Sequence, residues 1–527
     1  MFDPLHIPGG PETYWTTINA EENLPGVVTP LSSSFWLRPV TVGTLGAFAD
    51  LGVLAESEVR YSDDVDQRIC SVMYGRFAAN VDLLRRCADR TPGTSGDALE
   101  QQLFSNVRPG IPARNNIRRY GIVAVKAPAA AAGVAGRIRA GFLASQVWWR
   151  RSIDAAPHDD LAAARGRLAE ANNRMAAMMR PHTLGTFVTS GVFDQLRALA
   201  SAANRPGLDL ELSRGLGAVE ETEMLSMLWD ASRGRTTVED FLRRYGFHGP
   251  GEAAASSSVW REQPETLKPL IASYRDMPEN RSPAAAARAV AGHRREAAEQ
   301  LMASLPRAKR PMARAVLAMS DRVWPLRETG KATLLHAIDV GRAAARRLGE
   351  LMAADGQLEN PSDTAHLTVE ELTSSLSRGG WPEQVDYRRA RRQEYLTYSL
   401  PQTWAGVPAP VVSSSMAAAE PVRSLTALGG SPGIAEGRVR VMHDPYESEL
   451  TDGEVLVCEC TDPSWATHFL MASAVVIDVG GPMSHGAIVA RELGIPCVIN
   501  TRSGTRTLRD GDKVRVNGNT GTVTLLA

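Results

Sequence analysis

The feature that most constrains the fold of this chain is the stretch AVVIDVGGPMSHGAIVARELGIPCVIN, residues 474–500. Residues 474–479 are apolar and rich in β-branched side chains, a pattern that predicts a short buried strand. Gly480, Gly481 and Pro482 follow at once and are typical of a turn that ends a strand. The chain must therefore change direction here, directly after a strand that belongs inside a sheet.

The residues after the turn predict a short helix. Ser484 is a favourable N-cap, and the helix that it begins would start at His485. Gly494 stands where a left-handed residue is expected after a helix, and Pro496 prevents the helix from continuing. A second apolar strand is expected over residues 496–500. The stretch therefore predicts a strand, a glycine turn, a helix and another strand.

His485 falls in the first turn of that helix, where backbone N–H groups lack helical partners and the helix dipole is positive. Such a position binds phosphate. A neutral imidazole there is a candidate nucleophile, and the helix end would stabilise its phosphorylated form. The alternative is that His485 is only a polar residue at the start of a helix.

Composition narrows the class of protein. The chain has 527 residues and a formal net charge of −1, so its charge does not favour binding to nucleic acid or to an acidic membrane surface. No apolar run is expected to be long enough to cross a membrane; the richest one, residues 127–144, is mostly alanine and contains arginines. Five cysteines in so long a chain favour a reducing cytoplasm. Cys458 and Cys460 are interpreted as strand alternation rather than a metal site.

The C-terminal part is predicted to be a separate small domain. Residues 405–424 are rich in Pro, Ala and Ser and are interpreted as a flexible linker. Residues 425–527 are long enough for a single domain. They contain short β-like runs at residues 437–443, 454–460, 474–479, 496–500, 512–518 and 521–526.

Residues 1–404 are predicted to form a mostly α-helical domain. Residues 1–45, rich in Pro, Gly, Thr and aromatic side chains, are expected to be loop and extended chain. We also place a candidate subdomain boundary near residues 95–120, which contain two loop-like stretches. Helical spacing of apolar residues occurs over residues 158–180, 191–203, 286–320, 326–353 and 368–378.

The helical region contains a cluster suited to phosphoryl transfer. Arg327 and Lys331 are four residues apart and share one helix face, with Glu328 beside them. Two cations would neutralise the equatorial oxygens of a phosphoryl group, and a carboxylate would accept a hydroxyl proton. The alternative is an exposed helix face held by salt bridges.

A second stretch, DFLRRYGFHGPGE, predicts a helix that ends near Tyr245 and a glycine-rich turn. His248 and Glu252 lie in that turn and are candidate substrate-binding residues, although a helix C-cap and turn explain the glycines equally well. In TDPSWATHFLMASA, residues 461–474, His468 is interpreted as a surface or core residue rather than a catalytic one.

Together these residues resemble a known family. GGPMSHGAIVARELGIPCV is similar to the phosphohistidine motif of the swivelling domain of phosphoenolpyruvate-utilising enzymes, and GSPGIAEGRVRV and LRDGDKVRVNGNTGTV also match that domain. NLPGVVTPLS, FLRRYGFHGPGE, LRETGK and DTAHLTVEEL resemble the acceptor-binding domain of the rifampin phosphotransferase group. The resemblance implies that His485 carries the phosphoryl group and that Arg327, Glu328 and Lys331 meet it.

The resemblance also implies what this chain does not carry. Rifampin phosphotransferases begin with an ATP-grasp domain, which is expected to be missing here, as is the C-terminal barrel of relatives that handle pyruvate. The chain is therefore not expected to make or use phosphoenolpyruvate. Phenylphosphate synthase, whose ATP-binding part is a separate polypeptide, is the best precedent. Mg²⁺ and ATP are accordingly expected on a separate ATP-grasp partner subunit, with no metal site on this chain.

The resulting prediction is a cytoplasmic, dikinase-type phosphotransferase component. Its fold would be a mostly helical acceptor-binding domain followed by a small α/β swivelling phosphohistidine domain, which would move on the 405–424 linker. It would transfer a phosphoryl group from His485 to a hydroxyl of a small-molecule acceptor, with no nucleic-acid or membrane partner. Two alternatives remain open: a dehydratase driven by phosphorylation of an alcohol, and a non-catalytic homologue that binds a small molecule.

Overall fold

A computed structural model describes most of the chain. The described residues are 1–18, 20, 24–104, 107–108, 110–111, 114, 116–205, 207–216, 219–374, 381–412, 423–445, 450–481 and 484–526. Residues 413–422, half of the predicted linker 405–424, lie outside them, as do parts of the predicted subdomain boundary at 95–120.

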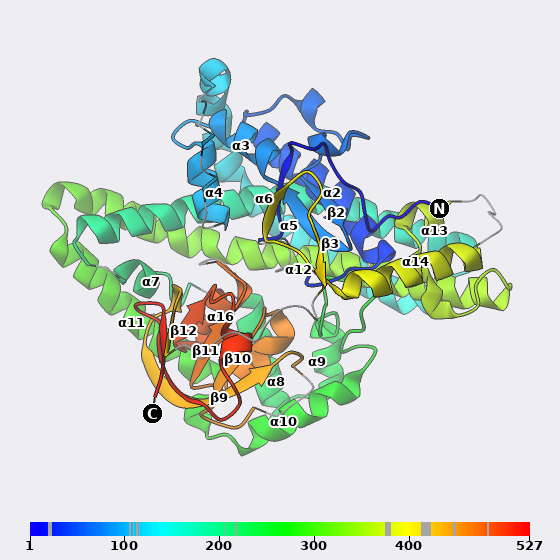
Figure 1. Ribbon diagram of the computed structural model, residues 1–527. Coiled ribbons are helices and arrows are strands. Elements are labelled where there is room, and N and C mark those ends of the chain that lie inside the picture. The colour runs from blue at the N-terminus through cyan, green and yellow to red at the C-terminus, as the bar shows by residue number, and fades with distance from the viewer. Residues whose placement is uncertain are drawn as a thin grey trace. The chain divides into compact units, whose positions relative to one another are not determined.

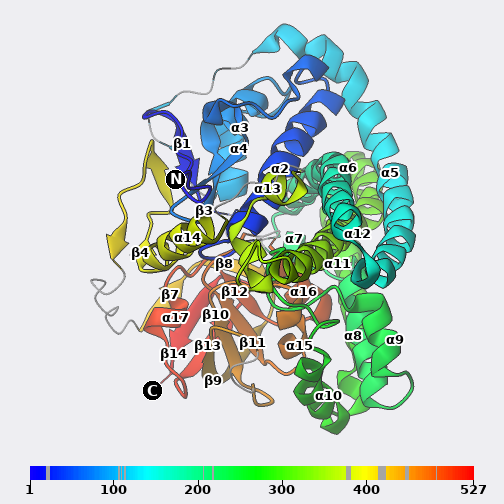
Figure 2. The ribbon, with the colours of Figure 1, turned by 90° about the vertical axis from the view of Figure 1, so that its right-hand side faces the viewer.

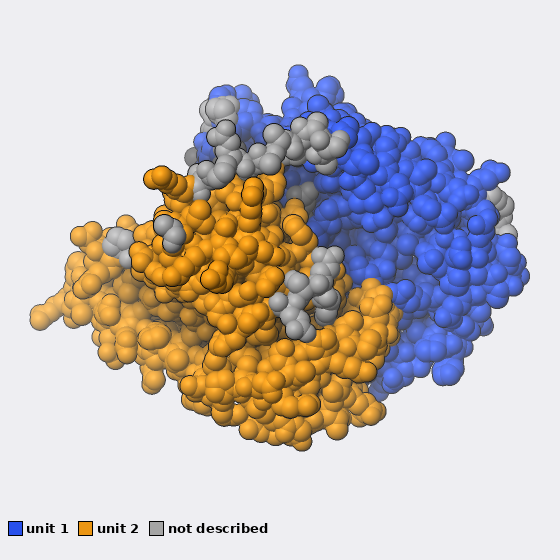
Figure 3. Space-filling view, turned by 60° about the horizontal axis from the view of Figure 1, so that its bottom comes forward, with its two compact units in different colours: residues 1–185, 251–257, 330–416 blue, residues 186–250, 258–329, 417–527 orange. Residues whose placement is uncertain are grey.

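Contacts within the chain divide it into two compact units (Figure 3). Unit 1 comprises residues 1–185, 251–257 and 330–416, and unit 2 comprises residues 186–250, 258–329 and 417–527. The predicted small domain, residues 425–527, thus falls in the same unit as part of the helical region. The chain passes from unit 1 to unit 2 for the last time between residues 416 and 417, within the predicted linker 405–424.

The prediction of loop and extended chain over residues 1–45 is wrong for residues 30–45. Helix α2, Pro30–Asp50, begins after Thr29, whose side chain accepts a hydrogen bond from Ser32 N, and Pro30 takes the first helical position. Buried serines of α2 satisfy their hydroxyl groups by hydrogen bonds to backbone carbonyls of the same helix: Ser34 Oγ donates to Pro30 O at 2.8 Å. Almost every side chain of α2 is buried, so the sequence shows no polar face.

The rest of unit 1 surrounds α2 with helices and a small sheet. The sheet has the strand order β2-β3-β1-β5 and is antiparallel in all its pairs. Its strands are Tyr14–Thr16 (β1), Cys70–Met73 (β2), Arg76–Asn80 (β3) and Thr403–Ala405 (β5); β4, Tyr398–Ser399, pairs separately with β6, Val411–Val412. The helices are Val81–Asp89 (α3), Gly96–Phe104 (α4), Tyr120–Ala155 (α5), Val369–Thr373 (α13) and Trp381–Leu396 (α14), together with parts of the long helices Leu161–Ala202 (α6) and Arg310–Ala354 (α12).

Three helix predictions need correction. The predicted helices 158–180 and 191–203 are one helix, α6, which continues through Pro181. The predicted helix 286–320 is broken after α11, Pro283–Ser304, where Leu305 is extended and Pro306 follows. The predicted helix 368–378 is α13 up to Thr373, and residues 375–380 lie outside the described part of the chain.

One helical stretch, Ile117–His158, is long and apolar enough to cross a membrane by length and composition; an 18-residue window within it has a mean hydropathy of 1.3. This corrects the expectation that no apolar run reaches that length. Length and composition alone do not place a helix in a membrane, because helices of water-soluble proteins pass the same test. In unit 1 this helix carries polar contacts: Trp149 Nε1 donates to Asp339 Oδ2 at 2.8 Å, and Arg137 pairs with Asp50.

Unit 2 is built around an eight-stranded sheet of order β7-β14-β13-β9-β10-β11-β12-β8. The four central strands, β9 to β12, run parallel, and the outer strands pair antiparallel. The six predicted β-like runs all contain strands, and the structure adds β7 and β8. The strands are Ser424–Thr426 (β7), Leu428–Ser431 (β8), Ile434–Met442 (β9), Val455–Cys458 (β10), Ala474–Ile477 (β11), Cys497–Ile499 (β12), Lys513–Asn517 (β13) and Thr522–Leu525 (β14).

Helices cover one face of this sheet (Figures 1 and 2). Next to the sheet lie α15, Ala466–Phe469, and α16, His485–Leu493, with the short α17, Gly504–Thr507, elsewhere in the same region. Outside α15 and α16 lie α8, Val219–Ser232, and α11. Unit 2 also contains α7, Leu208–Leu212, α9, Val238–Tyr245, α10, Leu267–Asp276, and the remaining parts of α6 and α12.

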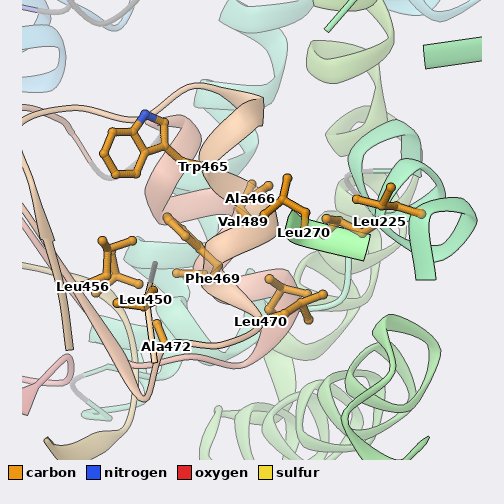
Figure 4. Packing of buried hydrophobic residues seen from close by; sticks show 14 of the residues in the cluster. Leu225, Leu270, Leu450, Leu456, Trp465, Ala466, Phe469, Leu470, Ala472 and Val489 are labelled. Carbon is orange, nitrogen blue, oxygen red and sulfur yellow. The ribbon is translucent and has the colours of Figure 1, made fainter. Parts of the chain in front are cut away.

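The buried side chains alternate between the two faces of the sheet. Val455 and Val457 of β10 join the apolar cluster on one face, whereas Leu456 and Cys458 join the cluster on the other. The second cluster also contains residues from α8 to α10, so α16 is enclosed in a continuous core. Figure 4 shows Leu270 of α10 beside Val489 of α16.

Candidate active site

The helix predicted to begin at His485 is present. Ser484 is extended at the N-cap position, α16 runs from His485 to Leu493, and Gly494 ends it in the left-handed conformation with φ 72°. Pro482 and Met483 of the predicted turn lie outside the described residues. His485 therefore stands at the first position of a helix that follows a buried parallel strand.

A glycine lets α16 pack closely on its neighbours. A Cβ on Gly486 would lie 2.3 Å from Ile477 Cδ1 and 2.7 Å from Thr461 Oγ1. Ile477 ends β11, and Thr461 follows β10. Because the carboxyl ends of the parallel strands β10 and β11 meet at one edge of the sheet, Thr461 and the start of α16 are brought together there.

Both ring nitrogens of His485 face polar side chains. Nδ1 lies 3.3 Å from Thr461 Oγ1. Both residues belong to the part of unit 2 that contains the eight-stranded sheet, residues 423–526, which is called the α/β region below. Nε2 points the other way, to α8, and lies 3.1 Å from Glu221 Oε1. His485 and Glu221 are both buried, with 7% and 4% of their surface exposed. Glu221 is not evident from the sequence, because its place beside His485 depends on how α8 packs against α16.

His485 Nε2 and Glu221 Oε1 are close enough to form an ion pair. Glu221 stands in the first turn of α8, together with Glu220, where the helix dipole favours negative charge. The site thus holds a carboxylate against the imidazole where both side chains are buried.

Two charged residues later in α16 hold the helix in position. Arg491 is fully buried, and its Nε donates to Gly430 O at 2.6 Å; burial, with a smaller contribution from the charge of Arg327, lowers the pKa of Arg491 to about 10. Glu492 Oε1 accepts a hydrogen bond from Leu216 N at 3.1 Å. The first contact fixes α16 to the sheet region, and the second attaches it to the helical part of unit 2.

The predicted phosphoryl-binding cluster lies on α12, as expected, with partners that sequence spacing alone did not provide. In unit 2, Arg327 Nη1 lies 3.7 Å from Glu328 Oε1. Lys331 follows one helical turn later and belongs to unit 1, where its Nζ lies 3.6 Å from Glu252 Oε1. The structure therefore links Lys331 to Glu252, a residue predicted independently for the substrate pocket.

Glu252 is held by a buried clamp within unit 1. Arg342 Nη2 donates to Glu252 O at 2.7 Å and to Ala254 O at 3.1 Å, and its Nη1 donates to Asp339 Oδ1 at 2.8 Å. Trp36 Nε1 donates to Ala253 O at 2.7 Å. These contacts fix the backbone of the loop 251–257, so the Glu252 carboxylate has a defined position beside Lys331.

His248, the other predicted pocket residue, lies in unit 2 and is buried among aromatic rings. Its ring centroid is 4.2 Å from that of Phe247 and 6.1 Å from that of Trp260, and its backbone carbonyl accepts from Trp260 N at 2.8 Å. The predicted end of the preceding helix near Tyr245 is confirmed by α9. His468, interpreted as surface or core, is buried in α15, and burial lowers its pKa to about 4.

Within the described ranges of the chain, no group of three or more His, Cys, Asp or Glu side chains is arranged to hold a metal ion. Of the pair interpreted as strand alternation, Cys458 is buried and Cys460 is half-buried, and neither is part of a disulfide.

Comparison with known proteins supports the resemblance in both parts of the chain. Residues 450–521, which contain His485, match the mobile domain of phosphoenolpyruvate-utilising enzymes. Residues 153–328, which contain Glu221, Arg327 and Glu328, match the fourth domain of rifampicin phosphotransferase. The predicted resemblance to this group of enzymes is confirmed.

Several curated relatives carry the name rifampicin phosphotransferase. The one from Streptomyces sviceus is 32% identical over 59% of this chain and 37% of its own length. The one from Bacillus subtilis is 29% identical over 55% of this chain and 34% of its own length. The chain thus spans about a third of the length of these relatives. Among solved structures, aconitase X from Thermococcus kodakaraensis matches 20% of this chain and 98% of its own at 20% identity, with a TM-score of 0.17.

Proposed function

We propose that this protein is a phosphotransferase component that carries a phosphoryl group on His485 and transfers it to a hydroxyl of a small-molecule acceptor. The observation that carries the proposal is the position of His485: it begins a helix at the carboxyl edge of a parallel sheet, inside the region that matches a mobile domain of phosphoenolpyruvate-utilising enzymes. A helix start favours a bound phosphoryl group through its N–H groups and dipole.

In the first step, a ring nitrogen of His485 attacks a phosphorus atom of ATP. The N–P bond forms as the O–P bond to the rest of the nucleotide breaks, and the electron pair of that bond leaves with the nucleotide. ATP, with Mg²⁺, is held by an ATP-grasp partner, which we propose to be a separate subunit.

In the second step, the acceptor hydroxyl attacks the phosphorylated histidine. The O–P bond forms as the N–P bond breaks, and the electron pair returns to the imidazole. Arg327 and Lys331 bind the equatorial oxygens of the phosphoryl group, and Glu328 accepts the hydroxyl proton. Glu252 orients Lys331, which it contacts at 3.6 Å, and His248 contributes to the acceptor pocket.

The proposal is tested by intact mass after incubation with Mg-ATP and an ATP-grasp partner, with His485→Ala as the matched variant. We expect an acid-labile gain of about 80 Da, one phosphoryl group, on the wild type but not on His485→Ala. Hydroxyl compounds are then screened for the transfer: the protein should lose this mass and the compound should gain it. Rifampicin is tested first because relatives carry the name rifampicin phosphotransferase.

No gain on the wild type with a partner that hydrolyses ATP would contradict the carrier role. The protein would then be assigned to the non-catalytic, small-molecule-binding alternative. A dephosphorylated product that has lost water would instead identify the dehydratase alternative.

A further inference from the structure

We propose that Glu221 is a positioning residue that occupies the phosphoryl site of unphosphorylated His485 and is expelled when His485 is phosphorylated. This inference rests on the proposed carrier role of His485. In the resting state, α16 is docked against α8, and the Glu221 carboxylate lies where the phosphoryl group would bind to His485.

Geometry selects Nε2 as the nitrogen that accepts the phosphoryl group. Nδ1 faces Thr461, which belongs to the same α/β region and moves with α16. Nε2 faces outward, to α8, and is the ring atom that a donor reaches when α8 is no longer against it. A hydroxyl suits the position beside Nδ1, because Thr461 Oγ1 can donate to a bare Nδ1 or accept from a protonated one.

Glu221 holds His485 in a form that cannot attack through Nε2. A carboxylate oxygen 3.1 Å from Nε2 would repel an unprotonated nitrogen, so Nε2 carries the proton, either in the neutral ring or in the imidazolium. In both forms Nε2 has no in-plane lone pair for attack on phosphorus. Removal of Glu221 lets the proton move to Nδ1, which then donates a hydrogen bond to Thr461 Oγ1, and frees the Nε2 lone pair.

Phosphorylation and the Glu221 contact exclude each other. A phosphorus atom bonded to Nε2, with its three oxygens, cannot fit in the 3.1 Å between Nε2 and Oε1. The phosphoryl group also brings about two negative charges next to the carboxylate, in a place where burial leaves little water to screen them. The docked contact thus favours unphosphorylated His485, and by linkage phosphorylation favours undocking.

The contacts around this pair are those of a specific docked state. Glu492 accepts from Leu216 N, Tyr274 Oη donates to Thr467 O at 2.9 Å, and Arg281 bonds to Asp452 and to Leu470 O. All of them join the helical part of unit 2 to the α/β region. In this set the Glu221 contact is the one that phosphorylation of His485 removes directly.

The accessibility of Nε2 can be measured without any enzymatic donor. Diethyl pyrocarbonate acylates unprotonated imidazole nitrogens, so the rate of modification of His485, read by peptide mass spectrometry at pH 7, reports release from Glu221. We expect this rate to rise at least about tenfold in Glu221→Ala and by a smaller factor in Glu221→Gln, which keeps the shape and loses the charge.

Glu223→Gln is the matched control, because Glu223 lies on the same helix but is exposed and pairs with Arg244. Its rate should stay within about twofold of the wild type, the range expected for an exposed ion pair. Equal rates in the wild type, Glu221→Ala and Glu221→Gln would overturn the proposal.

Expulsion of Glu221 is tested with phosphoramidate, a chemical donor. Nε2 attacks its phosphorus, the N–P bond to His485 forms, the N–P bond of phosphoramidate breaks, and ammonia leaves with the ring proton. After this treatment, amide hydrogen exchange in α8 and at residues 214–216 should rise in the wild type but not in treated His485→Ala. Unchanged exchange in fully phosphorylated protein would contradict expulsion.

These results are independent of the test of the proposed function. Faster acylation of Glu221→Ala together with no phosphorylation by the ATP-grasp partner would leave the Glu221 assignment standing and reject the carrier role. The reverse combination would establish the carrier role and reject the assignment of Glu221.

Discussion

Replacement of Arg342 with methionine should lower the free energy of unfolding of unit 1 by about 3–5 kcal/mol. Arg342 and Asp339 are both fully buried. The substitution removes the cation beside Asp339 and leaves a buried charge, and it also removes the donor to the carbonyls of Glu252 and Ala254. Each lost hydrogen bond to a charged group accounts for about 1.5–3 kcal/mol, so the structure predicts a loss in the upper range for single substitutions.

Thermal unfolding followed by circular dichroism, and urea unfolding followed by tryptophan fluorescence, measure this loss. The first unfolding transition should shift down by at least about 6 °C. Arg346→Met is the matched control: Arg346 lies one turn later on α12 and donates to Ser257 O in the same loop, but its side chain is exposed. Its loss should be at most about 1 kcal/mol.

The double variant Asp339→Leu/Arg342→Met separates charge from packing. Removal of both charges should recover most of the stability that Arg342→Met loses, because no unpaired charge remains in the core. The reasoning is refuted if Arg342→Met costs less than about 1 kcal/mol, or if the double variant is less stable than Arg342→Met by the full cost of a second substitution.

Two further predictions concern unit 2. Burial lowers the pKa of His468 to about 4, below the usual value of 6.5, so the unfolded chain binds more protons than the folded one between these pH values. The free energy of unfolding should therefore fall by about 3 kcal/mol as the pH drops from 6.5 to 4. Urea unfolding of His468→Gln should lack this part of the pH dependence. Gly486→Ala should lower the free energy of unfolding, measured by thermal unfolding, by about 1–3 kcal/mol because its Cβ would meet Ile477 and Thr461. Gly292→Ala, in α11 with open space around it, should raise it by about 0.5–1 kcal/mol. Equal effects of the two substitutions would contradict the close packing of α16.

The region around His485 was predictable because its signals are local. Two glycines, an N-cap serine and a left-handed glycine lie within a few turns of one another, and the flanking strands are apolar throughout because both faces of the parallel sheet are covered. Short-range sequence rules describe such a unit well. The same holds for Arg327 and Lys331, whose common helix face follows from their spacing.

Other features depended on packing that no local pattern contains. Helix α2 has a sequence typical of a loop, and only its burial on all sides explains why a helix with Pro39 inside it is stable there. Glu221 lies beside His485 because α8 packs on α16, and Glu252 lies beside Lys331 because Arg342 binds the carbonyls of its loop. No local sequence pattern marks Glu221. Only a search of all acidic residues for a partner of His485 would have included it.

The continuous apolar core around α16 bears on the temperature dependence of the proposed cycle. Trp465 and Phe469 of the α/β region share one cluster with Trp229 and Leu270 of the surrounding helices. Undocking would expose this surface to water and therefore carry a large positive heat-capacity change, whereas bond making at phosphorus would not. A curved Arrhenius plot for turnover would thus mark release of the histidine region as the slow step, and a straight one would assign that step to the chemistry.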